Sequence, residues 1–313
     1  MKSIIINKYG GPEVLEYSEM PKPVAGPGEV VIKTKFAAVN PADWKVRKGR
    51  LKIITGKKFP KILGIEASGI IEEVGEGVTS FMVGQHVYAA KDYTTGTNSE
   101  YFKVPENNVL LLPESMPFED AASIAVTGVA AYQCLLLHGG IEEGMKVLVN
   151  GASGGLGIMA VQIAKILGAE VTGVCSSRNI DLVKSLGADR LIDYTEKNLF
   201  DEDYQYDIII DSAGNLNLKN SKKLLTKKGI LIKVNISLLT VRDQFISSIF
   251  SSKKVKLVLM KVIKEDFQWI RDQIAIGRLK VIVDKIFDLK DCQKAHEYSE
   301  TLRANGKILL KVS

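Results

Sequence analysis

The stretch at residues 147–178, VLVNGASGGLGIMAVQIAKILGAEVTGVCSSR, constrains the fold of this chain more than any other segment. It begins with an apolar run, passes through a glycine cluster, continues with apolar residues at helical spacing and ends in a second apolar run. This order predicts a buried strand, a tight turn, a helix and a second strand. Two strands joined by a crossover helix belong to a parallel sheet.

The same alternation extends over residues 146–235. The further elements are predicted as a helix at 180–188, strands in RLIDY (190–194) and YDIIIDSAG (206–214), a helix in SKKLLTKKG (221–229) and a strand in ILIKVN (230–235). The runs VLVN, DIIID and ILIKV are apolar throughout, which is typical of strands that are covered on both faces. We therefore expect an α/β domain with a doubly wound parallel sheet.

The residues before and after this block follow other patterns. Strands broken by glycine and proline turns are predicted at 29–39, 67–75 and 84–90, with one helix at 41–49 that opens on a proline. The first part of the chain is therefore expected to form a mostly antiparallel β domain. The tail is predicted to contain helices in EDFQWIRDQIAIG and KDCQKAHEYSETLR and a last strand in GKILLKV.

The glycine cluster has the spacing Gly-x-x-Gly-Gly-x-Gly, which is a variant of the dinucleotide-binding fingerprint. Glycine permits positive φ and close approach of a ligand to the backbone, and the following helix directs its free N–H groups at an anion. Packing alone also favours glycine at such junctions, but here strand, helix and second strand are all present. The predicted cofactor-binding residues of this loop are Gly151, Ser153, Gly154, Gly155, Leu156 and Gly157.

The end of the second strand indicates which dinucleotide binds. An acidic residue at this point would accept the ribose 2′-hydroxyl of NAD, but the chain has Ser176, Ser177 and Arg178, with no acidic residue before Asp181. Two hydroxyls and a guanidinium suit a 2′-phosphate, so the sequence predicts NADPH. Tyr194 is a further candidate for the adenine-phosphate pocket. The alternative is that Arg178 is a solvated residue that opens a helix.

Composition and charge exclude several other classes of protein. The net charge of +6 is spread widely, and the lysine clusters at 219–229 and 251–261 lack interleaved aromatics, so they are interpreted as solvated helix faces and nucleic acid is disfavoured as a partner. The uncharged run at 121–137 is shorter than the ~20 residues of a membrane span and is predicted to be a buried helix pair, with no membrane partner. The three cysteines form no disulfide framework, which fits a cytoplasmic location, and the three histidines have no metal-ligand spacing.

Several blocks of the chain, in order, resemble the medium-chain dehydrogenase/reductase superfamily in its zinc-free quinone oxidoreductase branch, which includes plant-type enone and alkenal reductases. The blocks are GGPEVLEYSEMPKPVAGPGEVVIKTKFAAVNPADWKVRKG, GIEASGIIEEVGEGVTSFMVGQHV, AVTGVAAYQCL, VLVNGASGGLG and RANGKILLKV. The resemblance implies a GroES-like β domain, completed by the tail, beside a Rossmann domain. The expected boundaries are 1–122 with 267–313 for the first domain and 123–266 for the second.

The resemblance also implies a chemistry. Asn40 and Ile65 stand where zinc-dependent relatives carry metal ligands, so no metal site is expected and the acceptor should need little activation. The expected reaction is transfer of hydride from NADPH to a quinone or to the conjugated C=C of an α,β-unsaturated ketone or aldehyde. Asn40 and Lys45 are the candidates for meeting charge on the acceptor oxygen. Asp43 is expected to organise the turn, and Thr127 to face the nicotinamide and phosphates.

Two other classes of protein share some of these features. A short-chain dehydrogenase needs a Tyr-x-x-x-Lys pair, and none of the ten tyrosines has a lysine four residues on. A non-catalytic NADPH-binding protein with an RNA-binding or structural role stays open as the alternative. The expected partner is a small hydrophobic electron acceptor, and the resemblance also makes a homodimer an expectation.

Overall fold

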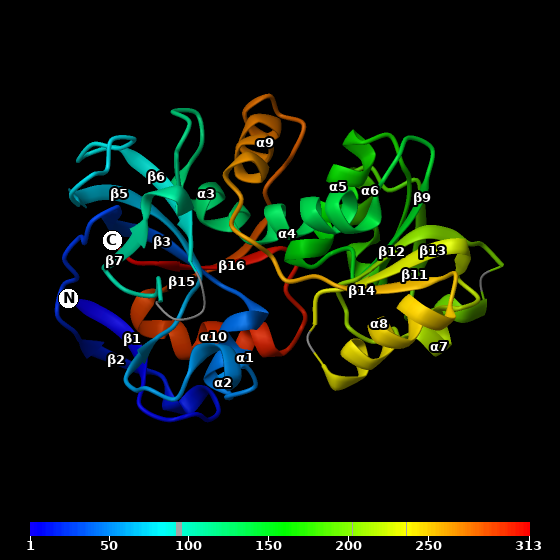
Figure 1. The fold of residues 1–313 in the computed structure, drawn as a ribbon, viewed down its shortest axis with the longest axis horizontal. Helices are drawn as coiled ribbons and strands as arrows, with labels where there is room; N and C mark the ends of the chain where they lie inside the picture. The colour runs from blue at the N-terminus through cyan, green and yellow to red at the C-terminus, as the bar shows by residue number, and fades with distance from the viewer. Residues whose placement is uncertain (92–95, 202, 236) are drawn as a thin grey trace. The chain divides into compact units, whose positions relative to one another are not determined.

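The computed structural model describes residues 1–91, 96–201, 203–235 and 237–313, and it divides into two compact units. Unit 1 comprises Met1–Val126, Val262–Ala275 and Val281–Ser313, and unit 2 comprises Thr127–Lys261 and Ile276–Lys280. The fold class is the α/β combination that the sequence predicted: a mostly antiparallel β unit and a parallel-sheet unit (Figure 1).

Unit 2 is built on a parallel sheet with the strand order β11-β10-β9-β12-β13-β14. The order reverses between β9 and β12, so right-handed crossovers place α5 and α6 on one face and α7 and α8 on the other (Figure 1). Ligands of such sheets bind outside the carboxyl ends of the strands at this switch point. The elements are β9 (Lys146–Asn150), β10 (Glu170–Cys175), β11 (Arg190–Asp193), β12 (Tyr206–Asp211), β13 (Leu225–Lys233), β14 (Lys254–Leu257), α4 (Thr127–Gln133), α5 (Gly155–Ile166), α6 (Ile180–Ser185), α7 (Leu218–Ser221) and α8 (Leu238–Phe250).

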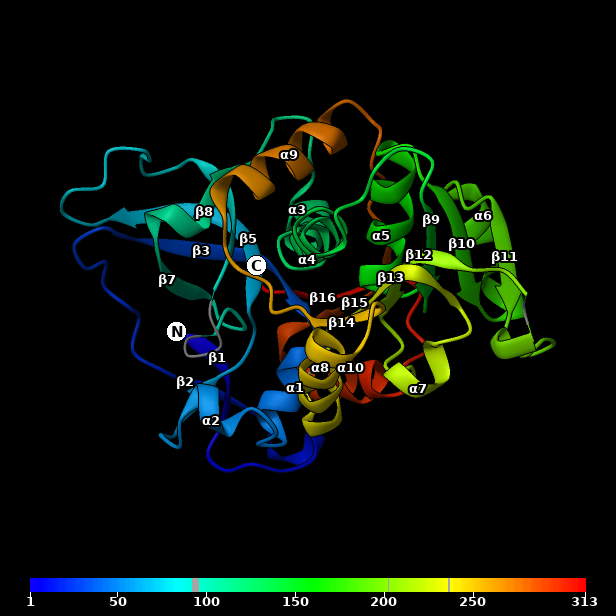
Figure 2. The ribbon, with the colours of Figure 1, turned by 45° about the vertical axis from the view of Figure 1, so that its right-hand side comes forward.

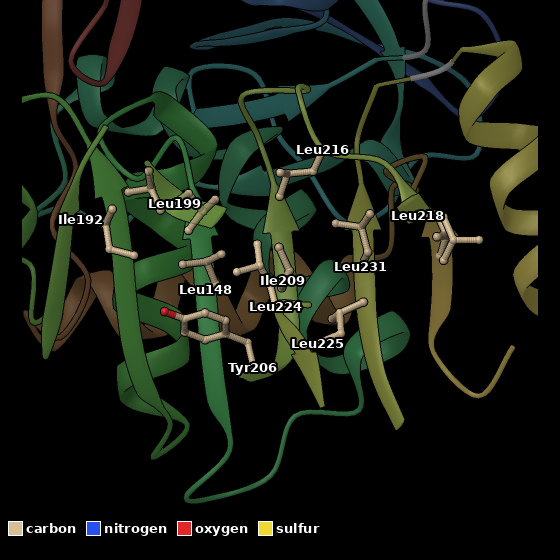
Figure 3. Packing of buried hydrophobic residues seen from close by; sticks show 12 residues of the cluster. Leu148, Ile192, Leu199, Tyr206, Ile209, Leu216, Leu218, Leu224, Leu225 and Leu231 are labelled. Atoms are coloured by element: carbon tan, nitrogen blue, oxygen red, sulfur yellow. The ribbon is translucent and has the colours of Figure 1, made fainter. Parts of the chain in front are cut away.

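The core of unit 2 confirms that the apolar strands are covered on both faces, because the consecutive residues 208–210 of β12 are all at most 1% exposed. Leu148, Ile209 and Leu231 come from the neighbouring strands β9, β12 and β13 and lie in one buried row (Figure 3). Burying side chains of this size contributes about 1.5–3 kcal/mol each. The central strands therefore form a rigid base for the loops at their carboxyl ends.

Unit 1 contains a sheet with the order β15-β16-β3-β5-β6-β8, in which β7 also pairs with β3, and a smaller sheet with the order β2-β1-β4. The terminal strand β16 pairs antiparallel with β3, with Leu309 opposite Ala38, so the tail does return to the first part of the chain. The strands are β1 (Lys2–Ile6), β2 (Glu16–Glu19), β3 (Glu29–Val39), β4 (Lys61–Ile62), β5 (Glu66–Val74), β6 (His86–Ala90), β7 (Tyr101–Pro105), β8 (Val109–Leu111), β15 (Val283–Asp288) and β16 (Lys307–Lys311). The helices are α1 (Pro41–Arg47), α2 (Lys52–Thr55), α3 (Phe118–Ile124), α9 (Lys264–Ala275) and α10 (Cys292–Glu300).

One predicted element is wrong. The helix expected at 221–229 is absent from the described residues, because α7 ends at Ser221 and β13 begins at Leu225. Leu224 and Leu225 are buried in the core of the sheet, and Leu225 lies opposite Tyr206 of β12. In SKKLLTKKG, lysines on both sides of two leucines resemble the pattern of a surface helix. Residues from Leu225 onward nevertheless form a strand, because they pair with β12.

The uncharged run at 121–137 is helical, as predicted. It belongs to a longer helical stretch, Phe118–Gly139, which contains α3, α4 and a π-helical turn at Cys134–Gly139. Among the described residues this stretch is the one with the length and hydropathy of a membrane span, and 72% of its most apolar window is buried within the protein. A helical stretch that is mostly covered by protein fits the predicted core helices.

Candidate functional site

The glycine turn follows β9 at the switch point of the sheet in unit 2. Gly151 has φ +88°, and the N–H groups of Gly151 and Ala152 donate to the carbonyl of Val174 in β10 at 3.1 and 2.9 Å. At Gly157 a Cβ would come within 2.1 Å of the Gly151 carbonyl oxygen. The turn therefore requires glycine at both positions, because one needs positive φ and the other needs the space.

The side of the turn that carries Gly154 is open. Gly154 is the N-cap of the twelve-residue helix α5, and a Cβ there would come no nearer to a neighbouring atom than 3.6 Å. Gly155 follows as the first helical residue, so bare backbone surrounds the N-terminus of α5. This arrangement fits a pyrophosphate, since the first N–H groups of a helix are unsatisfied within it and attract an anion.

The residues at the end of β10 lie around this turn. The buried hydroxyl of Ser176 has no hydrogen-bond partner among the described residues, while Ser177 Oγ lies 2.8 Å from Thr195 Oγ1. The Asn179 amide donates to Ser153 Oγ at 3.0 Å and so joins the glycine turn to this segment. A buried hydroxyl without a partner costs about 1–3 kcal/mol, which a bound polar ligand would recover.

Arg178 and Tyr194 complete this edge of the sheet. Tyr194 N–H donates to the Cys175 carbonyl at 3.0 Å, so Tyr194 follows β11 directly beside the end of β10. Both side chains are exposed. The structure thus gathers the predicted cofactor residues of β9, β10 and β11 at the carboxyl edge of one sheet. Thr127 is buried at the start of α4, whose helix packs against α5.

A carboxylate that sequence reasoning missed lies beside Ser177. Asp193 ends β11 and accepts hydrogen bonds from the Thr195 N–H at 2.9 Å and the Thr195 hydroxyl at 2.6 Å. Hydrogen bonds from the Ser177 and Thr195 hydroxyls hold the pKa of Asp193 below its usual range. This fixed negative charge would oppose a phosphate at the same place, so a cation such as Arg178 would have to outweigh it. The sequence showed Asp193 only as the fourth residue of RLIDY and gave no indication of the hydroxyls that contact it.

A second missed group joins the ends of the central strands. Asn150 Nδ2 donates to Asp211 Oδ1 at 2.8 Å, and Lys233 Nζ donates to Asp211 Oδ2 at 2.8 Å. Asp211 also accepts from the Gly214 and Leu216 N–H groups at 2.8 and 3.0 Å. All three side chains are buried, and each ends an apolar run. A polar residue at the close of such a run was the available signal.

In unit 1 the predicted residue Asn40 belongs to a buried polar network. Asn40 Nδ2 donates to Glu66 Oε1 at 2.9 Å, and Lys307 Nζ donates to Asn40 Oδ1 at 2.6 Å. Lys307 also pairs with Glu66, whose other oxygen accepts from the Val126 N–H at 2.7 Å. The three side chains are at most 4% exposed. Asn40 is therefore held in one orientation by a buried ion pair.

Asp43 is brought to the same place. At the start of α1, the Asp43 carboxylate accepts a hydrogen bond from the Asn40 N–H at 2.6 Å. Asp43 is only 1% exposed. Burial raises the pKa of Asp43 to about 7, against the opposing effect of the Asn40 N–H and the Lys307 charge. This placement agrees with the expectation that Asp43 organises the turn.

Lys45 lies on the same helix as Asp43. Its ammonium is 5.6 Å from the centroid of the Trp44 ring, and burial, together with the charge of Arg50, lowers its pKa from the ordinary value. A half-buried ammonium of this kind is suited to meet a negative charge that develops on a ligand.

The acidic residue of this network is paired within the chain. Within the described part of the chain, no three His, Cys, Asp or Glu side chains gather closely enough to hold a metal ion. Asn40, at one of the two positions where zinc-dependent relatives carry a metal ligand, instead accepts from the Lys307 ammonium, which also pairs with Glu66. The cation that balances Glu66 is thus supplied by the chain itself.

Comparisons with known proteins agree with this geometry. The family model described as zinc-binding dehydrogenase matches residues 186–310, and that of the alcohol dehydrogenase GroES-like domain matches residues 26–114. A chloroplast envelope quinone oxidoreductase homolog from Arabidopsis thaliana is 30% identical over 99% of this chain and 98% of its own length.

Solved structures of the same class share the complete fold. The quinone oxidoreductase from Coxiella burnetii matches with a TM-score of 0.92 and 27% identity, covering 100% of this chain and 99% of that one. The Escherichia coli quinone oxidoreductase, solved in complex with NADPH, matches with a TM-score of 0.88 and 26% identity over 100% of both chains. The sheet order, the glycine turn and these matches together show that the chain is an oxidoreductase of the medium-chain dehydrogenase/reductase superfamily and belongs to its quinone oxidoreductase branch.

Proposed function

We propose that this protein uses NADPH to reduce a quinone or the conjugated C=C of an α,β-unsaturated ketone or aldehyde, without a metal ion. The observation that carries the proposal is the buried Ser176 hydroxyl, which has no partner among the described residues and follows the end of β10 beside the open glycine turn. The relatives named as quinone oxidoreductases support the quinone as acceptor.

The cofactor would be held by backbone and side chains of unit 2. The N-terminus of α5 would bind the pyrophosphate, and Ser176, Ser177 and Arg178 would bind the 2′-phosphate. Tyr194 would border the adenine. NADPH supplies a hydride when it is bound. The central network of Asn150, Asp211 and Lys233 would keep the strand ends in place and hold the glycine turn in its binding conformation.

Residues of unit 1 would act on the acceptor. Lys307 and Glu66 fix the Asn40 side chain with its oxygen toward the ammonium and one amide hydrogen toward the carboxylate, which leaves the second amide hydrogen for a ligand. The Lys45 ammonium would stabilise negative charge on the acceptor oxygen. In a conjugated acceptor the negative charge is delocalised onto the oxygen. The amide of Asn40 and the ammonium of Lys45 would therefore suffice to stabilise it without a metal ion.

The test is turnover of purified, chelator-treated protein, followed as loss of nicotinamide absorbance, with a naphthoquinone and a short-chain enone offered separately. Reduction of either acceptor with NADPH supports the proposal, and the ratio of the two kcat/KM values assigns the acceptor class. Tight NADPH binding without reduction of either acceptor would contradict it and favour a non-catalytic role.

The cytoplasmic location stays a prediction. All three cysteines are buried free thiols, as a reducing compartment allows, while the Arabidopsis relative is named for the chloroplast envelope. Fractionation of the native cells, with the protein followed by antibody, is the measurement that decides.

A further inference from the structure

Helix α8 has its polar and apolar faces the opposite way round from an ordinary surface helix. The side chains that it turns toward the protein are Thr240, Asp243 and Ser247, which are at most 3% exposed. The exposed large apolar residues of the same helix are Leu238, Leu239, Val241, Phe245, Ile246, Ile249 and Phe250. A helix on a water-facing surface normally buries its apolar stripe, so this exposed face calls for a partner.

Polar contacts rather than apolar packing hold α8 in this orientation. Asp243 Oδ2 accepts from the Leu218 N–H of α7 at 3.0 Å, and Ser247 Oγ accepts from the Val255 N–H of β14 at 2.9 Å. Gln244 Oε1 accepts from the N–H of Leu257, also in β14, at 2.6 Å. Asp243 and Ser247 lie one helical turn apart on the buried face, and the exposed Gln244 adds a contact at its edge. The orientation is thus specified by the sequence, and the apolar residues are left for another surface.

The chain around α8 is strongly basic. Residues 212–261 contain ten lysines and one arginine but a single acidic residue, Asp243. Of these lysines, Lys233 pairs with the buried Asp211, and none of the other nine contacts a carboxylate among the described residues. The exposed ones include Lys219, Lys222, Lys223, Lys227 and Lys228.

Hydrogen bonds join two of the segments that carry these lysines to α8. Helix α7, which carries Lys219, lies beside α8 in both views (Figures 1 and 2), and the hydrogen bond from Leu218 to Asp243 joins the two helices. Lys254 donates to the main-chain oxygens of Ser247 and Ser248 at 3.0 and 3.2 Å, so its positive charge sits at the C-terminal end of α8. An apolar face and a basic rim therefore form one surface, which we call the α8 face.

We propose that the α8 face docks on a lipid bilayer that contains anionic headgroups. The apolar residues would enter the boundary between headgroups and acyl chains while the lysines bind the headgroups, as interfacial helices do. A second copy fits less well, because a symmetric contact would bring two unpaired lysine clusters together. A nucleic acid would bind the lysines but would leave the phenylalanines and isoleucines exposed to water.

This proposal departs from the sequence expectation of no membrane partner. A membrane span needs about 20 apolar residues, whereas docking needs only one exposed helix face. The proposal does not rest on the proposed activity, since lipid binding is measured without turnover. Docking would, however, bring the enzyme to a phase in which hydrophobic acceptors dissolve.

The test is flotation of the full-length protein with two kinds of vesicle, one of phosphatidylcholine alone and one with about a third phosphatidylglycerol. We expect binding to the anionic vesicles and at least roughly tenfold weaker binding to the neutral ones. Raising salt from about 0.1 to about 1 M, which shortens the screening length from about 10 to about 3 Å, should weaken the anionic binding. The variant Phe245→Ser/Phe250→Ser should lower the partition coefficient on the order of tenfold or more.

Matched controls keep the result interpretable. The variant Met82→Ser/Ile276→Ser changes two apolar side chains that are equally exposed but lie outside α8, and it should bind vesicles like the wild type. Circular dichroism and NADPH affinity should be the same in all three proteins, because the changed residues are exposed. No binding of the wild type to anionic vesicles, equal binding to both vesicle types, or equal binding by the α8 variant would overturn the proposal. So would a stable dimer that the α8 variant dissociates, which would identify a second copy as the occupant.

Discussion

Lys307 is the residue on which the buried network of unit 1 depends. Its ammonium balances the Glu66 carboxylate, and both side chains are almost fully inaccessible to water, at 4% and 0% exposure. Replacing Lys307 with methionine keeps the length of the side chain but leaves a buried carboxylate without its cation. We expect the free energy of unfolding to fall by about 3–5 kcal/mol, measured by urea denaturation.

The double variant Lys307→Met/Glu66→Gln serves as the control for this prediction. Glutamine can still accept from the Val126 N–H, and no charge is left unpaired. It should therefore lose less stability than Lys307→Met alone, because the single change carries the cost of an isolated charge. Losses that simply add in the double variant would contradict the account of the network.

Asp43 should make stability depend on pH in an unusual direction. Its folded-state pKa is raised from 3.8 to about 7, mainly by burial, so the folded protein binds this proton more tightly than the unfolded chain. The stabilising contribution is complete below about pH 4 and is lost as pH rises to about 7. Asp43→Asn removes this loss. The stability of the variant relative to the wild type should therefore rise by about 1 kcal/mol per pH unit across that window.

The measurement is urea denaturation of both proteins at several pH values. Taking the difference between them removes the contributions of all other titrating groups. A difference that stays constant between pH 4 and 7, or that falls as pH rises, would show that Asp43 is charged in the folded state throughout this window.

Sequence reasoning at the residue scale succeeded where position along one strand was enough. Ser176, Ser177 and Arg178 follow an apolar strand directly, so their place at the carboxyl edge of the sheet could be predicted. Glu66 and Lys307 are 241 residues apart and meet only through the pairing of β16 with β3. No local pattern carries that information.

Gly154, the N-cap of α5, and Gly157, in its first turn, differ in the space around them, and substitution separates their effects. Gly157→Ala would place a Cβ 2.1 Å from the Gly151 oxygen, so the turn must shift, and stability should fall by about 1–3 kcal/mol. Gly154→Ala meets no atom nearer than 3.6 Å and should change stability by less than about 0.5 kcal/mol.

Gly154→Ala tests whether the glycine turn binds the cofactor. The new methyl group at position 154 would stand where the pyrophosphate approaches the N-terminus of α5, so NADPH should bind at least roughly tenfold more weakly. Calorimetric titration of both stable proteins measures this. Unchanged NADPH affinity in Gly154→Ala would move the phosphate site away from the turn.

Helix α8 shows that the sequence pattern of a helix does not always reveal which of its faces is buried. Its apolar residues recur at helical spacing, and a pattern of this kind is normally taken to mark the buried side. The structure buries Thr240, Asp243 and Ser247 instead. Helix α7 offers an N–H group to Asp243, and β14 offers one to Ser247. Which face a helix buries depends on the groups that its neighbours present, and these come from other parts of the chain.

At the scale of the whole molecule, the chain returns to its first domain at the end. Strand β16 lies between β15 and β3 in the sheet of unit 1 and carries Lys307. Removing residues 306–313 would open this sheet in its interior and leave Glu66 unpaired. Both tryptophans, Trp44 and Trp269, belong to unit 1. Their emission in the truncated protein should therefore move to the red, toward the spectrum in urea.

Removal of Ser313 alone, which is exposed and lies outside β16, should leave the emission unchanged. A truncated protein with native emission and an unchanged urea transition would be inconsistent with β16 as an interior strand. The sequence predicted the two domain classes from strand patterns, while the return of the tail came from family resemblance. A single strand such as GKILLKV does not show which sheet it joins.

The central claim is that the Ser-Ser-Arg segment selects the phosphorylated cofactor, and calorimetric titration of NADPH and NADH into the wild type and Arg178→Ala tests it most directly. The wild type should prefer NADPH even though the Asp193 carboxylate lies nearby. Loss of one charge-assisted, bidentate contact should weaken NADPH about 10- to 100-fold and change NADH affinity less than about threefold. Equal weakening of both cofactors, or no weakening of NADPH, would contradict the account.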